Sequence, residues 1–232
     1  MGLTIYGTAA SRAARPLWVA SELGLVYNHI ATPYLGGATR TAKFLAINPN
    51  GHIPAIDDRG VIVWESMACA LYLAERFSKP ASSDLWARTA AELADVLRWA
   101  FWAVTEIEKD ALVFLMHTQA MDAERRKPAL ARDAERRLVK PLQVLEQHLQ
   151  RVAAQRAQGN EQAVFLAGHR FTVADVCVAS VLAWVIDAND LLRPVPAVCD
   201  WLQRCVARPA YAKVNLLTKS ARSPSIYCLC SY

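Results

Sequence analysis

A carboxylate and a hydroxyl stand side by side at Glu65 and Ser66, directly before an apolar stretch with helical spacing over residues 67–77. The first turn of a helix leaves backbone N–H groups without partners, so a hydroxyl at this point predicts a binding site for an anion such as a carboxylate. The neighbouring Glu65 could receive an ammonium group. Together the two side chains predict a receptor for a small zwitterionic peptide.

A proline-containing turn lies just upstream of this pair. Residues 48–51 form a turn cluster, and His52 and the Ile53-Pro54 bond follow it into an expected strand. Proline is tolerated at the first residue of a strand, and the bond before a proline is where a cis peptide costs little. A cis bond here would turn the Ile53 backbone outward, where its N–H and C=O could pair with an extended ligand.

The two motifs together resemble those of the cytosolic glutathione transferases. The resemblance rests on Asn-Pro-x-Gly-x-Ile-Pro-Ala-Ile from residue 48 and on Glu-Ser-x-Ala-x-x-x-Tyr-Leu from residue 65, and it covers about residues 1–215. It implies an α/β, thioredoxin-like first domain that binds glutathione and an all-α second domain that shapes the site for an electrophile. A cap at Thr172–Asp175 and the segment Arg208–Tyr211 resemble further landmarks of the family.

The order of the expected elements fits such a fold. Patterns predict a strand, a helix and a parallel strand over residues 3–6, 14–23 and 27–32, then one or two helical turns over 42–47, a hairpin over 56–64 and a helix over 67–77. Ligands of open sheets bind beyond the carboxyl ends of the parallel strands. The loop after Tyr6 and the segment before Pro54 are therefore expected at the same end of the sheet.

A linker rich in proline and serine at residues 78–84 marks a domain boundary. We expect residues 1–80 to form the glutathione-binding domain and residues 85–215 to form the all-helical domain. Residues 216–232 carry few periodic signals and are expected to be a tail.

Helical spacing of apolar residues continues through the second domain. It predicts long helices over residues 85–120 and 130–154, the latter kinked or restarted at Pro141. Thr172 and Asp175 form a capping box ahead of a stretch that is apolar nearly all round. That stretch is therefore expected to be the buried core of the domain.

The resemblance implies nucleophilic attack by the glutathione thiolate. A free thiol has a pKa of about 8.5, so the protein must favour the charged form with a hydrogen bond or a positive charge. Two hydroxyls compete for this role. Ser11, followed by Arg15, resembles the serine-type classes, and Tyr6 resembles the position used in the tyrosine-type classes. We favour Ser11, although it could simply cap the first helix, and we expect Tyr6 to pack in the core and Arg15 to be structural.

The resemblance also assigns the other contacts of glutathione. Glu65 would meet the γ-glutamyl ammonium and Ser66 its carboxylate, while the backbone before the proline pairs with the cysteinyl unit. His52 could donate to the peptide backbone or to the glycyl carboxylate. Arg40 is the candidate for the glycyl carboxylate, with Lys43 as the alternative; each of these charges could instead be a solvated surface group.

Composition excludes several classes of protein. The 232 residues are 54% hydrophobic and 20% charged, which is typical of a globular protein and not of a disordered one. The net charge of +5 comes from basic residues interspersed with acidic ones and without an aromatic–basic stripe, so we expect no nucleic-acid partner. The longest apolar run, residues 176–186, is too short to span a bilayer, and we expect no membrane partner.

Cysteine and histidine usage predicts a cytosolic protein without a metal. The six cysteines contain no C-x-x-C pair, and the closely spaced Cys228 and Cys230 in the expected tail are taken as incidental. The five histidines are scattered without the spacing of metal ligands. The chain also starts directly with its first expected strand, so we expect no signal peptide.

The most specific hypothesis is a glutathione transferase that attacks small hydrophobic electrophiles, with glutathione as co-substrate and a role in detoxification. The alternatives are a non-catalytic protein of the same fold that binds glutathione or other ligands, and a glutathione-dependent isomerase, dehalogenase or ether-cleaving enzyme. A thiol–disulfide or dehydroascorbate activity would require a cysteine near residue 11, where the sequence has none.

Two further expectations concern the second substrate and assembly. The electrophile pocket is expected between residues 8–12 and the helix with Trp99, Trp102, Phe114 and Met116, although aromatic residues at helical spacing are more often core. The helices over 67–77 and 85–120 carry more apolar positions than one domain contact needs. We therefore expect a homodimer, as the family resemblance also implies.

Overall fold

The computed structural model describes residues 2–80, 82–157 and 164–220, which divide into two compact units. The first unit contains the chain up to Trp86 together with the segment that starts at Arg208, and the second spans Ala87–Ala207. The two cysteines of the expected tail lie outside the described residues.

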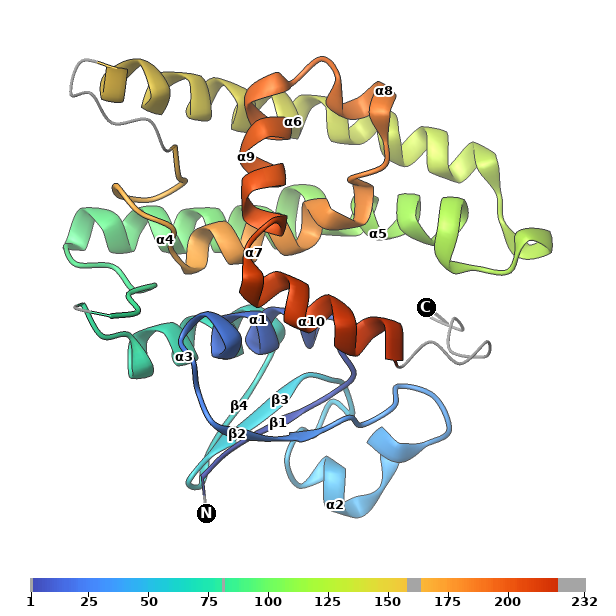
Figure 1. The fold of residues 1–232 in the computed structure, drawn as a ribbon. Helices are drawn as coiled ribbons and strands as arrows, with labels where there is room; N and C mark the ends of the chain where they lie inside the picture. Colours follow the sequence, from blue (N-terminus) through green and yellow to red (C-terminus); the bar gives the residue numbers. More distant parts are fainter. Residues whose placement is uncertain (1, 81, 158–163, 221–232) are drawn as a thin grey trace. The chain divides into compact units, whose positions relative to one another are not determined.

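Four strands form the sheet of the first unit in the order β2-β1-β3-β4 (Figure 1). The central strand β1 (Leu3–Tyr6) runs parallel to β2 (Tyr27–Ile30) and antiparallel to β3 (Ala55–Asp58), which pairs in turn with β4 (Val61–Trp64). With the helices between the strands, this is the β-α-β-α-β-β-α order that the sequence predicts. The thioredoxin-like class of the first domain is confirmed.

The hairpin between β3 and β4 turns at Arg59 and Gly60, whose φ angles are 54° and 96°. Two successive positive φ angles give a type I′ turn, the turn whose twist matches that of the two flanking strands. The Asp57 carboxylate accepts the N–H of Gly60 at 2.7 Å and closes the turn. The hairpin then leads the chain through Glu65 into α3 (Ser66–Phe77).

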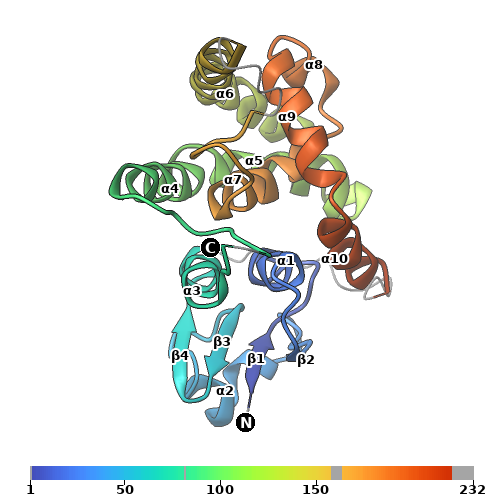
Figure 2. The same cartoon turned by 60° about the vertical axis from the view of Figure 1, so that its left-hand side comes forward.

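Helices cover both faces of this sheet. Helices α1 (Ala14–Glu22) and α3 lie on one face, and the short α2 (Ala42–Leu45) lies on the other (Figures 1 and 2). On the α2 side, the ring of Phe44 meets that of Tyr6 edge-on, with the ring centroids 6.3 Å apart. The half-buried Tyr6 ring thus packs against α2.

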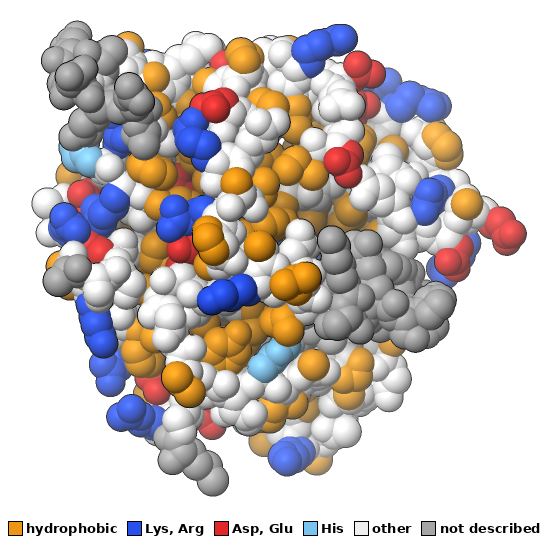
Figure 3. All heavy atoms as spheres, viewed as in Figure 1, with side chains coloured by type: hydrophobic (Ala, Val, Ile, Leu, Met, Phe, Trp, Pro, Cys, Tyr) orange, Lys and Arg blue, Asp and Glu red, His pale blue; other side chains and the backbone are white. Residues whose placement is uncertain are grey.

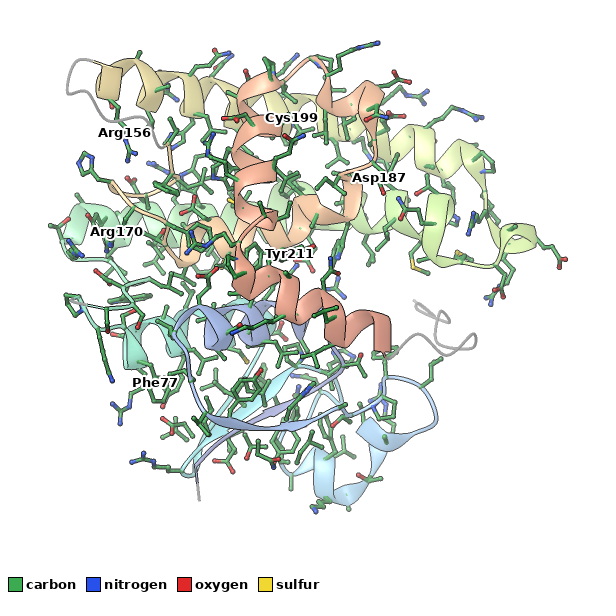
Figure 4. All side chains as sticks on the ribbon, in the orientation of Figure 1. Phe77, Arg156, Arg170, Asp187, Cys199 and Tyr211 are labelled. Carbon is green, nitrogen blue, oxygen red and sulfur yellow. The ribbon has the colours of Figure 1, made fainter. Side chains whose placement is uncertain are left out.

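The last described helix, α10 (Pro209–Ser220), belongs to the first unit and packs beside α1. Arg208 donates hydrogen bonds of 2.7 and 2.8 Å to the Glu22 carboxylate, which also accepts the indole N–H of Trp18 at 3.0 Å. The ring of Tyr211, labelled in Figure 4, lies 4.7 Å from that of Trp18. The first residues of the expected tail are therefore helical.

The described part of the second unit is built from helices, as the sequence predicts. Its first helix starts after Thr89, whose hydroxyl accepts the N–H of Glu92 at 3.1 Å. The α-helices are α4 (Ala90–Trp102), α5 (Glu108–Leu115), α6 (Pro128–Ala157), α7 (Val173–Leu182), α8 (Asn189–Leu192) and α9 (Pro196–Val206), with π-helical turns over Ala103–Ile107 and Met116–Ala120 and 3-10 turns over Ala123–Arg125 and Ala183–Val185.

Of the kink or restart expected at Pro141, the restart is wrong, because α6 continues through this residue, and the kink stays a prediction. A proline inside a helix removes one backbone hydrogen bond and crowds the preceding turn. Burial of one face of α6 offsets this cost. The buried side chains of this face include Leu138, Leu142, Leu145 and Leu149. Burying such side chains stabilises the helix by about 1.5–3 kcal/mol each, which exceeds the cost of the proline.

Two arginines hold the loop of residues 164–172, which precedes α7, through polar contacts (Figure 4). Arg156, near the end of α6, donates to the carbonyl of Gly168. Arg170 lies within 3.1 Å of the Glu92 carboxylate. The loop therefore enters α7 in a fixed conformation.

The capping box at the start of α7 is confirmed. Asp175 is fully buried, and its carboxylate accepts hydrogen bonds from the N–H and the hydroxyl of Thr172, from the N–H of Leu166 and from the indole of Trp201. Burial raises the pKa of Asp175 to about 6, although these hydrogen bonds oppose the rise. Folding raises this pKa from 3.8. The contribution of the Asp175 carboxyl to the free energy of unfolding therefore declines as the pH rises from 3.8 to about 6.

Replacing Asp175 by Ala is expected to destabilise the fold by at least about 3 kcal/mol, because it removes a helix cap and leaves buried donors of Leu166 and Trp201 without an acceptor. Urea denaturation measures this change. Asp200→Ala on α9 is the control: its carboxylate is exposed and should cost less than about 0.5 kcal/mol. An Asp175→Ala variant of unchanged stability would contradict the structural role of the carboxylate.

Candidate functional site

The chain is tightly packed around Gly7, directly after β1. A Cβ atom placed on Gly7 would lie 2.8 Å from the Cβ of Ala13 and 3.1 Å from the Cβ of Ile53, and the φ angle of Gly7 is +127°. Both facts require glycine at this position. The loop that carries Ser11 and the segment before Pro54 are therefore packed against each other, at the end of the sheet where the sequence predicts them.

The sheet register brings Glu65 and Ser66 to the same place. Ala55 pairs with Trp64 in the antiparallel ladder of β3 and β4. The residues before Ala55 and after Trp64 continue next to each other, so the Ile53–Pro54 segment lies beside the start of α3. The structure thus brings together most of the residues that the sequence assigned to one site.

Ser11 is held in a tight turn ahead of α1. Its hydroxyl donates to the carbonyl of Thr8 at 2.7 Å and accepts the N–H of Ala13 at 3.1 Å. The Thr8 carbonyl also accepts the N–H of Ser11 at 3.1 Å. A hydroxyl rotates freely about its C–O bond. The Ser11 hydroxyl can therefore turn to another acceptor without leaving the Thr8 carbonyl unpaired.

The competing hydroxyl of Tyr6 lies in a different environment. Burial, followed by the nearby charge of Asp57, raises the pKa of Tyr6 above its ordinary value. Its ring packs against Phe44. The phenol therefore stays protonated at neutral pH, where it can act as a hydrogen-bond donor but not as a base.

The backbone of Ile53 is open. The Ile53–Pro54 bond is cis, as the sequence suggests, and the Ile53 side chain is buried. Within the described parts of the chain, neither the N–H nor the C=O of Ile53 forms a hydrogen bond. An extended ligand could pair with both groups, as an added strand pairs with the edge of a sheet.

The turn before Ile53 is held by a buried asparagine. The amide of Asn48 donates to the carbonyl of His52 at 2.7 Å, and its oxygen accepts the N–H of Asn50 at 3.0 Å. Arg40, at the end of a 3-10 turn over Ala38–Arg40, donates to the carbonyl of Asn50 at 3.3 Å. Its exposed guanidinium therefore lies beside this turn, whereas Lys43 is exposed on α2.

Glu65 has an unusual backbone conformation for a residue other than glycine. Its φ and ψ angles are 71° and 121°, and its side chain is exposed. Among the described residues its carboxylate has no hydrogen-bond or ion-pair partner. Residues held in sparsely populated conformations cost about 1–3 kcal/mol and cluster at functional sites. The strained backbone at Glu65 thus carries an exposed carboxylate that is unpaired among the described residues.

Ser66 has a partner that the sequence reading missed. Its hydroxyl oxygen accepts a 2.7 Å hydrogen bond from Arg15, a residue of α1 that is only 1% exposed. The bond places the positive charge of Arg15 next to the first residue of α3. It also leaves the Ser66 hydroxyl free to donate its own proton in a hydrogen bond to an anion. A partner 51 residues away leaves no signal in local spacing, so the sequence could assign Arg15 only a structural place in α1.

The aromatic residues expected around the second substrate belong to the interior of the second unit. Trp99, Phe114 and Met116 are buried, and Trp99 packs against Trp102 with ring centroids 5.1 Å apart. Their main role is therefore packing of the helices. The expected electrophile pocket remains a prediction.

Three features of the described residues bear on partners and metals. None of the helices is both long and apolar enough to cross a membrane. On the face drawn in Figure 3, basic and acidic side chains of the described residues are interspersed. Among these residues, no group of three or more His, Cys, Asp or Glu side chains gathers as metal ligands would.

Comparisons with known proteins agree with the geometry. The model of the "Glutathione S-transferase, N-terminal domain" family matches residues 1–75, and that of the "Glutathione S-transferase, C-terminal domain" family matches residues 105–209. The chain is 26% identical over 221 residues to glutathione S-transferase GstB of Escherichia coli K12, covering 94% of this chain and 100% of GstB.

A second relative carries a different description. The chain is 26% identical over 223 residues to the transcriptional regulator URE2 of Saccharomyces cerevisiae, and the match covers 84% of this chain and 62% of that protein. Among solved structures, glutathione transferase F7 from Populus trichocarpa matches with a TM-score of 0.79 at 22% identity, covering 93% and 98% of the two chains. Ure2p in complex with glutathione matches with a TM-score of 0.78 at 23% identity, covering 92% and 97%. At these identities the structural likeness shows the fold alone.

The strain at Glu65 predicts an unusual response to glycine. Glu65→Gly should raise the free energy of unfolding by about 1 kcal/mol, because glycine adopts positive φ without the steric cost, whereas Glu65→Ala keeps the strain and should not stabilise. Arg59→Gly is the control, since its φ of 54° lies in the milder left-handed region of a turn and should gain less. Chemical denaturation without ligand measures all three variants. Equal stability of the glycine and alanine variants at position 65 would show that the backbone there is unstrained.

Proposed function

We propose that this chain, which belongs to the glutathione S-transferase family, catalyses attack of the glutathione thiolate on small hydrophobic electrophiles. The observation that carries the proposal is the open backbone of Ile53 between the unpaired Glu65 carboxylate and the loop of Ser11. A peptide with a free ammonium group, a carboxylate and a thiol matches this set of groups. The reaction needs glutathione as co-substrate and no metal.

The start of α3 supplies the proposed contacts for the γ-glutamyl unit. The Glu65 carboxylate binds the ammonium group, and the Ser66 hydroxyl donates to the carboxylate, with the buried charge of Arg15 beneath it. Charge-assisted hydrogen bonds of this kind contribute about 1.5–3 kcal/mol each. Most of the affinity for glutathione is therefore expected to come from this end of the ligand.

The proline turn supplies the contacts for the rest of the peptide. The N–H and C=O of Ile53 pair with the cysteinyl unit, which fixes the direction in which its thiol points. His52 is exposed beside them and donates to the peptide backbone or the glycyl carboxylate. Arg40 is the stronger candidate for the glycyl carboxylate, because it lies against the same turn, and Lys43 is the alternative.

In the proposed mechanism the Ser11 hydroxyl turns from the Thr8 carbonyl and donates to the glutathione sulfur. A hydrogen bond to the charged form lowers the pKa of the bound thiol, so more of it is thiolate at neutral pH. The nearby start of α1 adds the positive end of a helix dipole. The proposed serine-type chemistry thus requires no charged side chain next to the sulfur.

A second candidate is a protein of the same fold that binds glutathione without turnover. The observation that favours it is the relative described as a transcriptional regulator, which this chain resembles at the same identity as GstB. Isomerase, dehalogenase and ether-cleaving reactions use the same thiolate and differ only in the second substrate. Turnover of a panel of electrophiles separates these enzymes from the binding protein. A location in the cytosol is proposed for all of them.

Ser11→Ala is expected to lower turnover by about 10- to 100-fold, because it deletes a preorganised donor to the sulfur. The KM for glutathione should change little, and the pH–rate profile should move to higher pH as the bound thiol regains its proton. Steady-state kinetics from pH 5.5 to about 9 test both changes.

Tyr6→Phe is the matched control and should do much less, since its hydroxyl lies on the α2 side of the sheet. The opposite pattern, with Tyr6→Phe inactive and Ser11→Ala near normal, would establish tyrosine-type chemistry and overturn the role of Ser11.

We also propose that the protein is a homodimer. Exposed apolar side chains occur in both units, on β4 at Val61, Ile62 and Trp64 and on the helical run of the second unit at Phe101 and Val104. A two-fold interface would cover such side chains. Sedimentation at micromolar concentration should give twice the chain mass of 25.6 kDa, and Trp64→Glu with Phe101→Glu should shift it to the monomer. A wild-type monomer would contradict the proposal.

A further inference from the structure

The carbonyl of Gly7 is held by a side chain and not by the sheet. The ladder between β1 and β2 ends with the N–H of Gly7 on the carbonyl of Ile30 at 2.9 Å. The N–H of Thr32, two residues beyond the end of β2, turns back to the Ile30 carbonyl at 2.6 Å. The Nε2 atom of His29 lies 2.8 Å from the Gly7 carbonyl oxygen instead. Because a carbonyl can only accept, Nε2 must carry the proton.

This hydrogen bond fixes the peptide from which the Ser11 loop departs. The C=O of Gly7 and the N–H of Thr8 share one planar peptide group, so holding the oxygen sets the orientation of Thr8. The Thr8 carbonyl in turn accepts the hydroxyl and the N–H of Ser11 at 2.7 and 3.1 Å. A chain of three short links therefore leads from the imidazole to the Ser11 hydroxyl.

The same peptide group also sets the distance between the two halves of the site. Gly7 has no room for a Cβ atom between Ala13 and Ile53. A rotation of the Gly7 peptide would move the Ser11 loop relative to the Ile53 backbone, to which the cysteinyl unit is proposed to bind. Displacements of about 1 Å in such a constellation can cost on the order of 100-fold in rate.

We propose that His29 is a positioning residue that holds Ser11 at the correct distance from the glutathione sulfur. It acts through the Gly7 carbonyl and does not touch the substrate. The inference rests on the proposed function of Ser11. It also gives a reason for a polar residue at position 29, which pairs in the sheet with the fully buried Ile5.

The test compares three substitutions that differ in where they place a donor. His29→Leu removes the donor, His29→Asn places an amide near the Nδ1 position, and His29→Gln places one near Nε2. Turnover should fall about tenfold for the Leu and Asn variants and return to within about threefold of wild type for Gln. The KM for glutathione should stay within about twofold for all three, because Glu65 and Ser66 are unaffected. In the Leu and Asn variants, the ultraviolet absorbance of the bound thiolate should appear at a higher pH than in the wild type.

Asn28→Ala is the matched control, since Asn28 is an exposed residue of the same strand and pairs with Thr4; it should leave turnover near wild type. If His29→Leu does not fold, the comparison of Asn with Gln still decides the matter. Normal turnover in His29→Asn or His29→Leu, or equal loss in Gln and Asn, overturns the proposal. So does a rise in KM without a loss of turnover.

A double substitution separates this inference from the proposed function. If His29 acts only through Ser11, His29→Asn should have no further effect on turnover in a Ser11→Ala background. A full additional tenfold loss there contradicts the positioning role while leaving the role of Ser11 intact. If Ser11→Ala alone has no effect, the proposed function of Ser11 fails, whatever the His29 variants show.

Discussion

The close approach at Gly7 is the constraint on which the candidate site depends. A side chain there would collide with Ala13 and Ile53, so the helix α1 and the proline turn could not both reach the end of β1. The pairing of β1 with a strand on each side fixes the point from which the Ser11 loop departs. The Ser11 loop thus departs from one of the two strands that are paired on both sides, which limits how far the groups of the site can move relative to one another.

Buried polar contacts, and not surface ion pairs, determine the shape of this site. The hydrogen bonds from Arg15 to Ser66 and from Asn48 to His52 involve buried donors, whose loss would leave polar groups unpaired at a cost of about 1–3 kcal/mol each. An exposed pair such as Arg193 with Asp190 contributes at most about 1 kcal/mol. In contrast, two of the groups proposed to meet the ligand, the Glu65 carboxylate and the Ile53 backbone, have no partner among the described residues.

The sequence predicted those features that depend on interactions between residues close together in the chain. The proline turn, the hairpin, the capping box at Thr172 and the order of strands and helices each depend on residues a few positions apart, and the structure confirms them. The site residues followed largely from the family resemblance of their motifs, and the structure places the Ser11 loop and the segment before Pro54 at one end of the sheet.

Contacts between distant residues could not be predicted in this way. The bond from Arg15 to Ser66, the bond from His29 to Gly7 and the tie of Arg208 to Glu22 join elements whose approach depends on the whole fold. The continuity of α6 through Pro141 has a related cause, because burial of a long leucine face outweighs the local cost of the proline. In both cases tertiary packing decides what a local preference cannot.

The central claim is that this site binds glutathione and holds it as the thiolate. The most direct measurement is the ultraviolet absorbance of the thiolate when glutathione is titrated into the wild-type protein across a range of pH. We expect saturable binding, with the bound thiol ionising at least about one pH unit below the free value of about 8.5. Saturable binding with the ionisation left at the free value would instead indicate a protein that binds glutathione without activating it.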